Sequence, residues 1–312
     1  MRVLVTGATG FIGGALVSTL VATGAAVRGL SRTAPAGCEW QRADLTRAES
    51  VRGSCTDIDV VFHLAGIAHT RTRGSQHAEV TIAGTRALLA EALRAGVRRF
   101  IFISSIKALC SDDDYARSRL AAEDLVRNAP FEAIAIVRPG LVYGPGMKGN
   151  LARLLRFAAR GWPLPIPEGG AVRSLIHRDD LVRILIALME AVTDLLPYTL
   201  TDGEPYTLRA IYDVMRGGFG YGPVAYALPA TFLERLARFG DGVARWTAHP
   251  CPWDSQALAP LLQSYFSDDR RVWDELGLKP HYSLGSAMPE LVCAYRDARR
   301  KGPETPAPSP RP

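Results

Sequence analysis

Cysteine is scarce in this chain, and its spacing excludes two kinds of stabilisation. The five cysteines stand at positions 38, 55, 110, 251 and 293, an odd number without a CxxC pair. This argues against a disulfide framework and against a zinc site, and it suits a reducing cytosol. No apolar run approaches the ~18 residues of a membrane span. We therefore expect a soluble, cytoplasmic protein without a membrane partner or a structural metal.

Basic runs are also missing, although the chain carries a formal net charge of +6. Its arginines are dispersed, and the sequence shows no basic-aromatic module typical of nucleic-acid-binding proteins. A mild basic excess of this kind fits an anionic small ligand, and no nucleic-acid partner is expected. With 312 residues, the chain suits one large α/β domain or a main domain with a smaller lobe.

The N-terminal segment carries a glycine pattern with a specific context. Residues 3–13 read Val-Leu-Val-Thr-Gly-Ala-Thr-Gly-Phe-Ile-Gly, so a short β-branched run leads into glycines 7, 10 and 13 and then into an apolar-periodic helix. Glycine permits a sharp turn and close backbone approach, and the N–H groups at a helix start attract phosphate. The pattern predicts a dinucleotide-binding loop formed by Gly7, Thr9, Gly10, Phe11, Ile12 and Gly13. The alternative is a glycine-rich turn without a ligand.

Strand and helix patterns alternate through the first half of the chain. Strands are expected at 2–6, 25–31, 59–64, 99–104 and 133–138, and helices at 11–23, 76–95, 115–129 and 150–160. Such alternation predicts an α/β fold with a Rossmann-type, doubly wound parallel sheet. Ligands bind beyond the carboxyl ends of the strands in such sheets.

The pattern changes after about residue 140. Gly144-Pro145-Gly146 breaks the chain, and 162–167 form a stiff, proline-rich connection. Short strands near 173–176 and 198–201 and helices near 179–192, 207–217 and 229–246 are expected to follow. We predict a dinucleotide-binding domain at 1–145, to which later segments return, a smaller substrate-binding lobe at 146–300 and a disordered tail at 301–312.

The end of the second predicted strand bears on cofactor choice. An acidic residue there would accept hydrogen bonds from the adenosine ribose, but the sequence has Ser31 and Arg32. Arginine can grip a 2′-phosphate through two donors, which favours NADP(H) over NAD(H). The alternative to this 2′-phosphate role is that Arg32 is merely a solvated loop residue. Asp44 and Leu45 follow the position at which a dinucleotide-binding fold has its third strand, and they could hold the adenine ring.

These motifs and several later ones resemble those of the extended short-chain dehydrogenase/reductases, which include nucleotide-sugar epimerases, dehydratases and 4-keto reductases. The matching segments are Gly7 to Gly13, Asp44-Leu45, His63-Leu64-Ala65-Gly66, Ser104-Ser105, Tyr115, Arg138 to Pro145, Asp180-Leu181 and Glu275 to Pro280. The resemblance runs from residue 1 to about 297, and it places Leu64, Ala65 and Gly66 at the cofactor. It also implies a homodimer formed through helices that include the one bearing the tyrosine.

Within that family, the chain is similar to enzymes that reduce or epimerise the 4-position of UDP-linked N-acetyl-hexosamines and their 6-deoxy 4-keto forms. Residues 104–107 (Ser-Ser-Ile-Lys), 147–150 and 160–165 carry this likeness. It implies that Lys107, Asn150 and Arg173 bind the substrate, the latter two near the diphosphate. The structural alternatives are a helix N-cap for Asn150 and a surface strand charge for Arg173.

The family chemistry needs a phenol that exchanges a proton at the sugar oxygen while hydride moves to or from the nicotinamide. The resemblance assigns this role to Tyr115 and the carbonyl-binding role to Ser105. Ser104 is the poorer candidate, because side chains alternate along a strand. A half-buried tyrosine at a helix start is the structural alternative for Tyr115.

The sequence departs from the family pattern at three places. Arg119 stands one turn after Tyr115 where relatives have lysine; it supplies positive charge to the phenol and the nicotinamide ribose but stays protonated. Nine residues separate Ser105 from Tyr115, a shorter link than usual, and Asp112 to Asp114 within it suit a helix N-cap better than a metal site. Thr81 replaces an asparagine that serves the proton relay.

The leading hypothesis is an NADP(H)-dependent nucleotide-sugar oxidoreductase, a 4-keto reductase or a 4-epimerase for surface-polysaccharide precursors. The reductase is preferred because NADPH is chiefly a hydride source, whereas a recycling epimerase usually keeps NAD bound. Two alternatives remain open: a catalytically degenerate dinucleotide-binding module, and a reductase of another small carbonyl compound.

Overall fold

The computed structural model describes residues 1–66, 76–164, 166, 171–191, 197–226, 235, 238–242 and 264–300, with backbone alone at 76–80. Most of the helix expected at 229–246, and the tail at 301–312, lie outside these residues.

Seven strands form the main sheet, and every neighbouring pair in it is parallel. The strands are β1 (Arg2–Thr6), β2 (Ala26–Ser31), β3 (Glu39–Arg42), β4 (Val60–His63), β5 (Arg99–Ile103), β6 (Ala133–Pro139) and β9 (Tyr198–Leu200), in the order β3-β2-β1-β4-β5-β6-β9. The order reverses between β1 and β4, which is where such sheets bind ligands. The expected doubly wound parallel sheet is confirmed.

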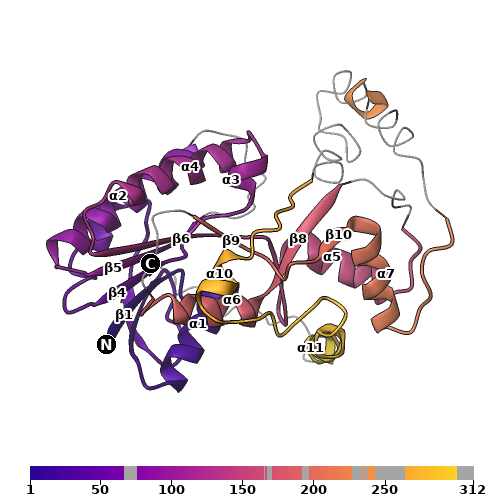
Figure 1. Ribbon diagram of the computed structural model, residues 1–312, viewed down its shortest axis with the longest axis horizontal. Helices are drawn as coiled ribbons and strands as arrows, with labels where there is room; N and C mark the ends of the chain where they lie inside the picture. The colour runs from indigo at the N-terminus through magenta and orange to yellow at the C-terminus, as the bar shows by residue number, and fades with distance from the viewer. Residues whose placement is uncertain are drawn as a thin grey trace, which may run out of the picture.

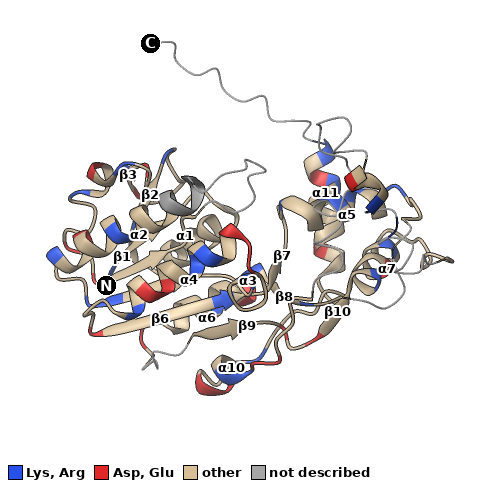
Figure 2. Cartoon of the chain, turned by 90° about the horizontal axis from the view of Figure 1, so that it is seen from above, with Lys and Arg blue, Asp and Glu red and all other residues tan. Residues whose placement is uncertain are grey.

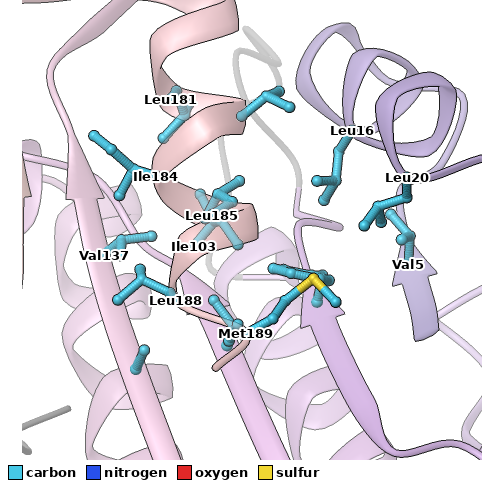
Figure 3. Packing of buried hydrophobic residues seen from close by; sticks show 14 of the residues in the cluster. Val5, Leu16, Leu20, Ile103, Val137, Leu181, Ile184, Leu185, Leu188 and Met189 are labelled. Atoms are coloured by element: carbon cyan, nitrogen blue, oxygen red, sulfur yellow. The ribbon is translucent and has the colours of Figure 1, made fainter. Parts of the chain in front are cut away.

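Helices cover both faces of this sheet (Figure 1). One face carries α1 (Phe11–Ala22), α6 (Arg178–Ala187) and α10 (Arg271–Glu275), and the other carries α2 (Gln76–Arg94), α4 (Asp114–Arg127) and the 3-10 helix η1 (Ala48–Val51). Figure 3 shows Leu181, Ile184 and Leu185 of α6 packed toward the strands, beside Leu16 and Leu20 of α1. The β-branched strands are apolar on both faces because helices bury both.

A second, three-stranded sheet lies beside the first. Its strands are β7 (Leu141–Tyr143), β8 (Val172–His177) and β10 (Pro205–Thr207), in the order β10-β8-β7, with β7 parallel and β10 antiparallel to β8. It packs with α5 (Gly149–Ala158), α7 (Leu208–Gly218) and α11 (Met288–Arg300) around a separate apolar cluster that includes Tyr143, Leu155, Tyr212 and Leu291. Figure 2 shows the charged residues mainly on the helices and loops of both parts.

Most of the expected helices and strands are observed, but the elements η1, β7, β10, α10 and α11 were not predicted, and two details in the second part differ. The helix expected at 179–192 ends at Ala187, where a turn closed by the N–H of Ala191 on the carbonyl of Ala187 follows. The N-cap of α5 is Lys148, not Asn150, and Asn150 is exposed in the first helical turn. The short helix α3 (Lys107–Cys110) was not expected either, and it forms four of the nine residues between Ser105 and Tyr115.

Candidate functional site

The three glycines after β1 are packed too closely for any other residue. A β-carbon on Gly13 would lie 2.2 Å from the carbonyl oxygen of Gly7, and one on Gly10 would lie 3.0 Å from the same atom. Gly7 has φ +68°, a left-handed conformation, and a β-carbon there would come 3.1 Å from the Ala65 nitrogen after β4. The glycines therefore bring the start of α1 against the ends of β1 and β4.

The start of α1 suits an anion. Gly10 is the N-cap, no side chain of the described residues caps it, and the first turn contains no acidic residue. The helix end thus keeps N–H groups and the positive end of its dipole for a ligand. A backbone cradle without side chains, open to a helix start, fits the pyrophosphate of a dinucleotide. The residues present therefore fit the cofactor that the sequence implied.

At the end of β2, Ser31 and Arg32 differ in exposure. Ser31 is buried, and its hydroxyl donates to the Thr33 carbonyl at 2.6 Å, so its proton is already used within the loop. Arg32 is exposed, so its guanidinium can reach a phosphate at the strand end. The Thr46 N–H bonded to Asp44 lowers the pKa of that carboxyl, and the charges of Arg32 and Arg47 add to the effect. Asp44 is therefore a carboxylate at neutral pH.

Leu45 lies beside Asp44 and packs tightly on α2. A β-carbon on Gly84 of that helix would lie 2.9 Å from the Leu45 β-carbon and from its carbonyl oxygen. This contact fixes the loop that follows β3 against α2.

His63 at the end of β4 forms a buried chain of hydrogen bonds that the sequence did not reveal. Its Nδ1 lies 2.9 Å from Thr6 Oγ1 and its Nε2 lies 3.0 Å from Thr85 Oγ1. Thr85 donates to the carbonyl of Thr81, so its oxygen receives the Nε2 proton; Thr6 accepts the Ala65 N–H and donates to Nδ1. Burial, with a contribution from Arg119, lowers the pKa of His63 to about 3.

His63 is therefore a neutral histidine of defined tautomer, and its hydrogen bonds link β4 to β1 and to α2. Thr81, which replaces the family's asparagine, takes part through its backbone carbonyl. The sequence does contain His63, but its position there predicted only the end of a strand.

Tyr115 and Arg119 lie together on α4, as their spacing predicted. The guanidinium carbon of Arg119 is 5.2 Å from the centre of the Tyr115 ring and 5.9 Å from that of Phe102. Its Nη1 donates to the Ile103 carbonyl at 3.3 Å, and a β-carbon on Gly66 would lie 1.9 Å from its Nη2. Arg119 is only 4% exposed, and its Nε is buried without a hydrogen-bond partner among the described residues.

Lys107 also lies close to the Tyr115 ring. Its Nζ is 5.9 Å from the centre of the Tyr115 ring, 5.5 Å from that of Tyr265 and 3.8 Å from Asp113 Oδ2. Asp113 is the N-cap of α4, with Oδ1 accepting from the Ala116 N–H at 2.7 Å. The expected capping by the aspartates is thus confirmed, and two cations, Lys107 and Arg119, lie within about 6 Å of the centre of the Tyr115 ring.

Tyr265 was not expected at the site, because it lies 150 residues from Tyr115 in the sequence. Its backbone pairs with both sides of Arg173 on β8, and burial, with a contribution from Asp113, raises the pKa of its phenol. Tyr265 is therefore a neutral phenol whose ring lies against Lys107.

The two serines after β5 differ in their surroundings. Ser104 is buried and donates to Glu123 Oε1 at 2.5 Å, and Glu123 also forms a bidentate pair with Arg138. Ser105 is partly exposed, and its Oγ accepts the Lys107 N–H at 3.3 Å. Ser104 is thus engaged within a buried group, in which Arg138 is also a partner of Glu123.

The two residues expected near a diphosphate are placed differently. Arg173 is 4% exposed, so it is not a surface charge; burial lowers its pKa, and its Nη1 donates to the Ala171 carbonyl at 3.1 Å. It adjoins Tyr265 and through that ring the Lys107 region. Asn150 is exposed in the first turn of α5.

The described residues lack a cluster of metal ligands: they contain no group of three or more His, Cys, Asp or Glu side chains arranged to hold a metal ion. None of the helices among them is both long and apolar enough to cross a membrane.

Comparisons with known proteins agree with this geometry. Residues 3–199 match the model of the NAD dependent epimerase/dehydratase family. The chain is 35% identical to ceramide reductase of Caulobacter vibrioides over 308 residues, 95% of each chain, and 28% identical to sterol demethylase protein B of Methylococcus capsulatus over 329 residues, 95% of this chain and 99% of that one.

A solved structure shows the same fold. UDP-glucose 4-epimerase from Thermotoga maritima, with UDP-glucose, superposes with a TM-score of 0.75 at 22% identity, over 96% of this chain and all of the other. The family model covers more than half of the chain and includes both the glycine loop and the Tyr115 helix. This protein therefore belongs to the NAD dependent epimerase/dehydratase family.

Proposed function

We propose that the protein is an NADP(H)-dependent oxidoreductase that reduces a carbonyl group, with Tyr115 as the proton donor. The observation that carries the proposal is that two cations lie close to the Tyr115 ring: the Arg119 guanidinium carbon is 5.2 Å and the Lys107 Nζ 5.9 Å from its centre. Nearby positive charge favours the phenolate that forms when a proton is given to the substrate. The ring lies on α4, and Arg119 of the same helix packs against Gly66 after β4.

The reaction adds one hydride and one proton to the carbonyl. The reduced nicotinamide, when bound, supplies the hydride to the carbonyl carbon. Tyr115 gives its hydroxyl proton to the carbonyl oxygen, so a ketone becomes a secondary alcohol. Ser105 orients that oxygen: its Oγ accepts the Lys107 N–H, which leaves its own hydrogen available for the substrate.

The residues proposed to hold the cofactor are those of the loop at 7–13, the segment Leu64 to Gly66, Arg32, Asp44 and Arg119. Arg32 is proposed to select NADP(H), because it is exposed at the end of β2 where no carboxylate competes for a ribose hydroxyl. Ser31 supports the turn rather than donating to the phosphate, since its proton is held by Thr33.

The first substrate class that we propose is a nucleotide-linked 4-keto sugar. Arg173 is a buried cation beside Tyr265, and it is the residue that we propose for the diphosphate. The relation to UDP-sugar epimerases at the level of fold is compatible with this choice.

A second substrate class is a ketone within a lipid. The observation in its favour is that two relatives covering nearly the whole chain carry the names ceramide reductase and sterol demethylase protein B. The departures in this chain, Arg119 and the short link before Tyr115, are compatible with a pocket remodelled for a different carbonyl compound.

One assay distinguishes these proposals. The purified protein is mixed with NADPH and, separately, with UDP-linked 4-keto-6-deoxy sugars and with long-chain acylamino ketones in detergent, while the NADPH absorbance is followed. Oxidation with one panel assigns the substrate class. Tight NADPH binding with turnover of neither panel would support the degenerate binding module instead. Tyr115→Phe should lower kcat by roughly a hundredfold or more, as expected for loss of a general acid.

The cofactor assignment has its own control. Arg32→Ala should weaken NADPH binding by roughly ten- to a hundredfold while NADH binding changes little, because a charge-assisted hydrogen bond is lost. Arg42→Ala removes a neighbouring exposed arginine at the end of β3 and should leave both affinities unchanged. Equal losses for NADPH and NADH in Arg32→Ala would contradict the 2′-phosphate role.

A further inference from the structure

Lys107 is held at the Tyr115 cluster by a carboxylate that also starts the tyrosine's helix. Asp113 Oδ1 caps α4 through the Ala116 N–H, and Oδ2 lies 3.8 Å from Lys107 Nζ. The Lys107 side chain is 26% exposed and lies against two rings, those of Tyr115 and Tyr265. A single aspartate therefore fixes the helix start and the lysine relative to each other.

Arg119, the other cation, is suited to charge but not to proton exchange. It is almost fully buried, with Nη1 on the Ile103 carbonyl and Nη2 against Gly66. A guanidinium does not release its proton at any pH at which the protein is folded, whereas an ammonium can. The position that carries the exchanging lysine in relatives is thus filled here by a fixed charge.

We propose that Lys107 supplies the proton exchange that Arg119 cannot, which makes it a positioning and proton-returning partner of Tyr115. The proposal rests on the reductase function given above. After Tyr115 has given its proton to the carbonyl oxygen, the Lys107 ammonium returns one to the tyrosinate. The neutral lysine then takes a proton from water, to which its partly exposed side chain has access. Two residues thus share the roles that one lysine has in relatives: Arg119 supplies a fixed positive charge, and Lys107 exchanges the proton.

The groups facing Lys107 come from four parts of the chain. Asp113 and Tyr115 belong to the start of α4, and Arg119 lies one turn further on. Arg173 belongs to β8, and Tyr265 lies in a separate segment that is bridged to it. Cys110 on α3 has a pKa raised by burial, as has Tyr265, so both are neutral near pH 7. Asp113 is thus the one negative charge in this set, and it holds the lysine at the site against the repulsion of two arginines.

The test uses four variants of the full chain. Lys107→Met removes the charge, and Lys107→Arg keeps it but blocks proton release. Asp113→Asn removes the ion pair but keeps a good N-cap, since asparagine caps helices as well as aspartate does. Lys279→Met removes the same charge at an exposed position on the loop after α10. Thermal unfolding of each variant checks that it folds.

Two readouts separate this proposal from the proposed function. The first is the ionisation midpoint of Tyr115 in the protein without cofactor, measured as the tyrosinate absorbance that is lost when Tyr115→Phe is added to each variant. Lys107→Met should raise this midpoint by about half a pH unit, the effect of one charge about 6 Å away in a solvated site. Lys107→Arg and Lys279→Met should leave the Tyr115 midpoint unchanged, and Asp113→Asn should change this midpoint detectably.

The second readout is the dependence of kcat on pH. Lys107→Met and Lys107→Arg should both lower kcat by about tenfold or more and alter the pH profile, with a smaller effect on KM. A wild-type midpoint in Lys107→Met would overturn the proposal, and so would full activity of Lys107→Arg, because arginine cannot return a proton. If the wild-type protein turns over neither substrate panel, the proposed function fails, while the midpoint still decides whether Lys107 acts on Tyr115.

Discussion

A β-carbon on Gly13 would lie 2.2 Å from the carbonyl oxygen of Gly7, well inside van der Waals contact. This proximity arises because Gly7 turns the chain at φ +68° and its carbonyl accepts the Gly10 N–H at 2.8 Å. The first turn of α1 therefore rests directly on the backbone of the loop. The loop and the helix start form one rigid unit at the reversal point of the sheet.

The glycine loop yields a prediction with a control one residue away. Gly13→Ala should displace α1 from the loop, weaken NADPH binding at least about tenfold and lower the thermal midpoint, because backbone atoms cannot give way cheaply. Gly14→Ala places its β-carbon 3.6 Å from the Ala8 carbonyl oxygen, an ordinary contact, and should bind NADPH normally. Fluorescence titration with NADPH measures both. Equal affinities in the two variants would show that the contact with Gly7 is unimportant.

The adjacent serines should separate stability from catalysis. Ser104→Ala removes the donor to the buried Glu123 and should lower the free energy of unfolding by about 1 to 3 kcal/mol, with kcat nearly unchanged. Ser105→Ala should do the reverse, lowering kcat roughly a hundredfold through loss of a donor to the carbonyl oxygen, with little effect on stability. Urea unfolding and steady-state kinetics are the measurements. If Ser104→Ala lost the activity and Ser105→Ala kept it, the two roles would have to be exchanged.

Replacing Arg119 tests how Arg119 and Lys107 contribute to proton exchange at Tyr115. Arg119→Lys should shift the pH profile of kcat and raise the rate, because a second titratable cation then adjoins Tyr115. The same change should recover part of the activity lost in Lys107→Met. Arg127→Lys is the control, at a partly exposed position two turns further along α4. Failure of Arg119→Lys to improve Lys107→Met at any pH would argue against proton return as the missing step.

Two buried groups predict opposite dependences of stability on pH. Burial raises the pKa of Asp202 to about 6 from 3.8. Its contribution to the free energy of unfolding is therefore fully present below pH 3.8 and is lost as the pH rises through 6. The pKa of His63 is lowered to about 3 from 6.5, so its contribution is present above pH 6.5 and is lost as the pH falls. Between pH 4 and 6 the two trends oppose each other, and the wild-type protein should show little change from this pair.

Asp202→Asn should reveal the contribution of His63 to the pH dependence of the free energy of unfolding. Asparagine still accepts from the Tyr206 hydroxyl, which donates to Asp202 at 2.8 Å, so the contact survives. The free energy of unfolding should then fall between pH 6 and 4 by up to about 1.4 kcal/mol per pH unit relative to wild type. Urea unfolding at several pH values measures this, with Asp274→Asn as an exposed control on α10. Parallel curves for wild type and Asp202→Asn would contradict the assignment.

Local pattern carried most of the fold prediction. The strand at Arg2–Thr6 and the start of α1 at Phe11 agree with expectation to the residue, because a β-branched run, glycines and an apolar period are all local signals. The helix at 179–192 was predicted too long, since its apolar run continues into the turn after Ala187. Asn150 was considered as an N-cap because asparagine often caps helices, yet the chain enters α5 through Lys148.

Motif spacing predicted the neighbours within one element but not those across elements. Tyr115 and Arg119 lie one helical turn apart, so their contact follows from the sequence. Tyr265 could not be placed, because its backbone pairing with Arg173 joins segments that are distant in the chain. The chain of hydrogen bonds through His63 likewise depends on three elements meeting.

The sequence by itself determined the parallel sheet, the glycine loop and the helix that carries Tyr115, since each follows from local periodicity and from what glycine alone permits. Tertiary structure decided the surroundings of the reacting phenol. It buried Arg119 against Gly66, turned Ser104 toward Glu123, and brought Lys107 beside Tyr115 through the cap at Asp113. Burial and distance between side chains depend on how elements pack, and the charge that a site presents to its substrate depends on both.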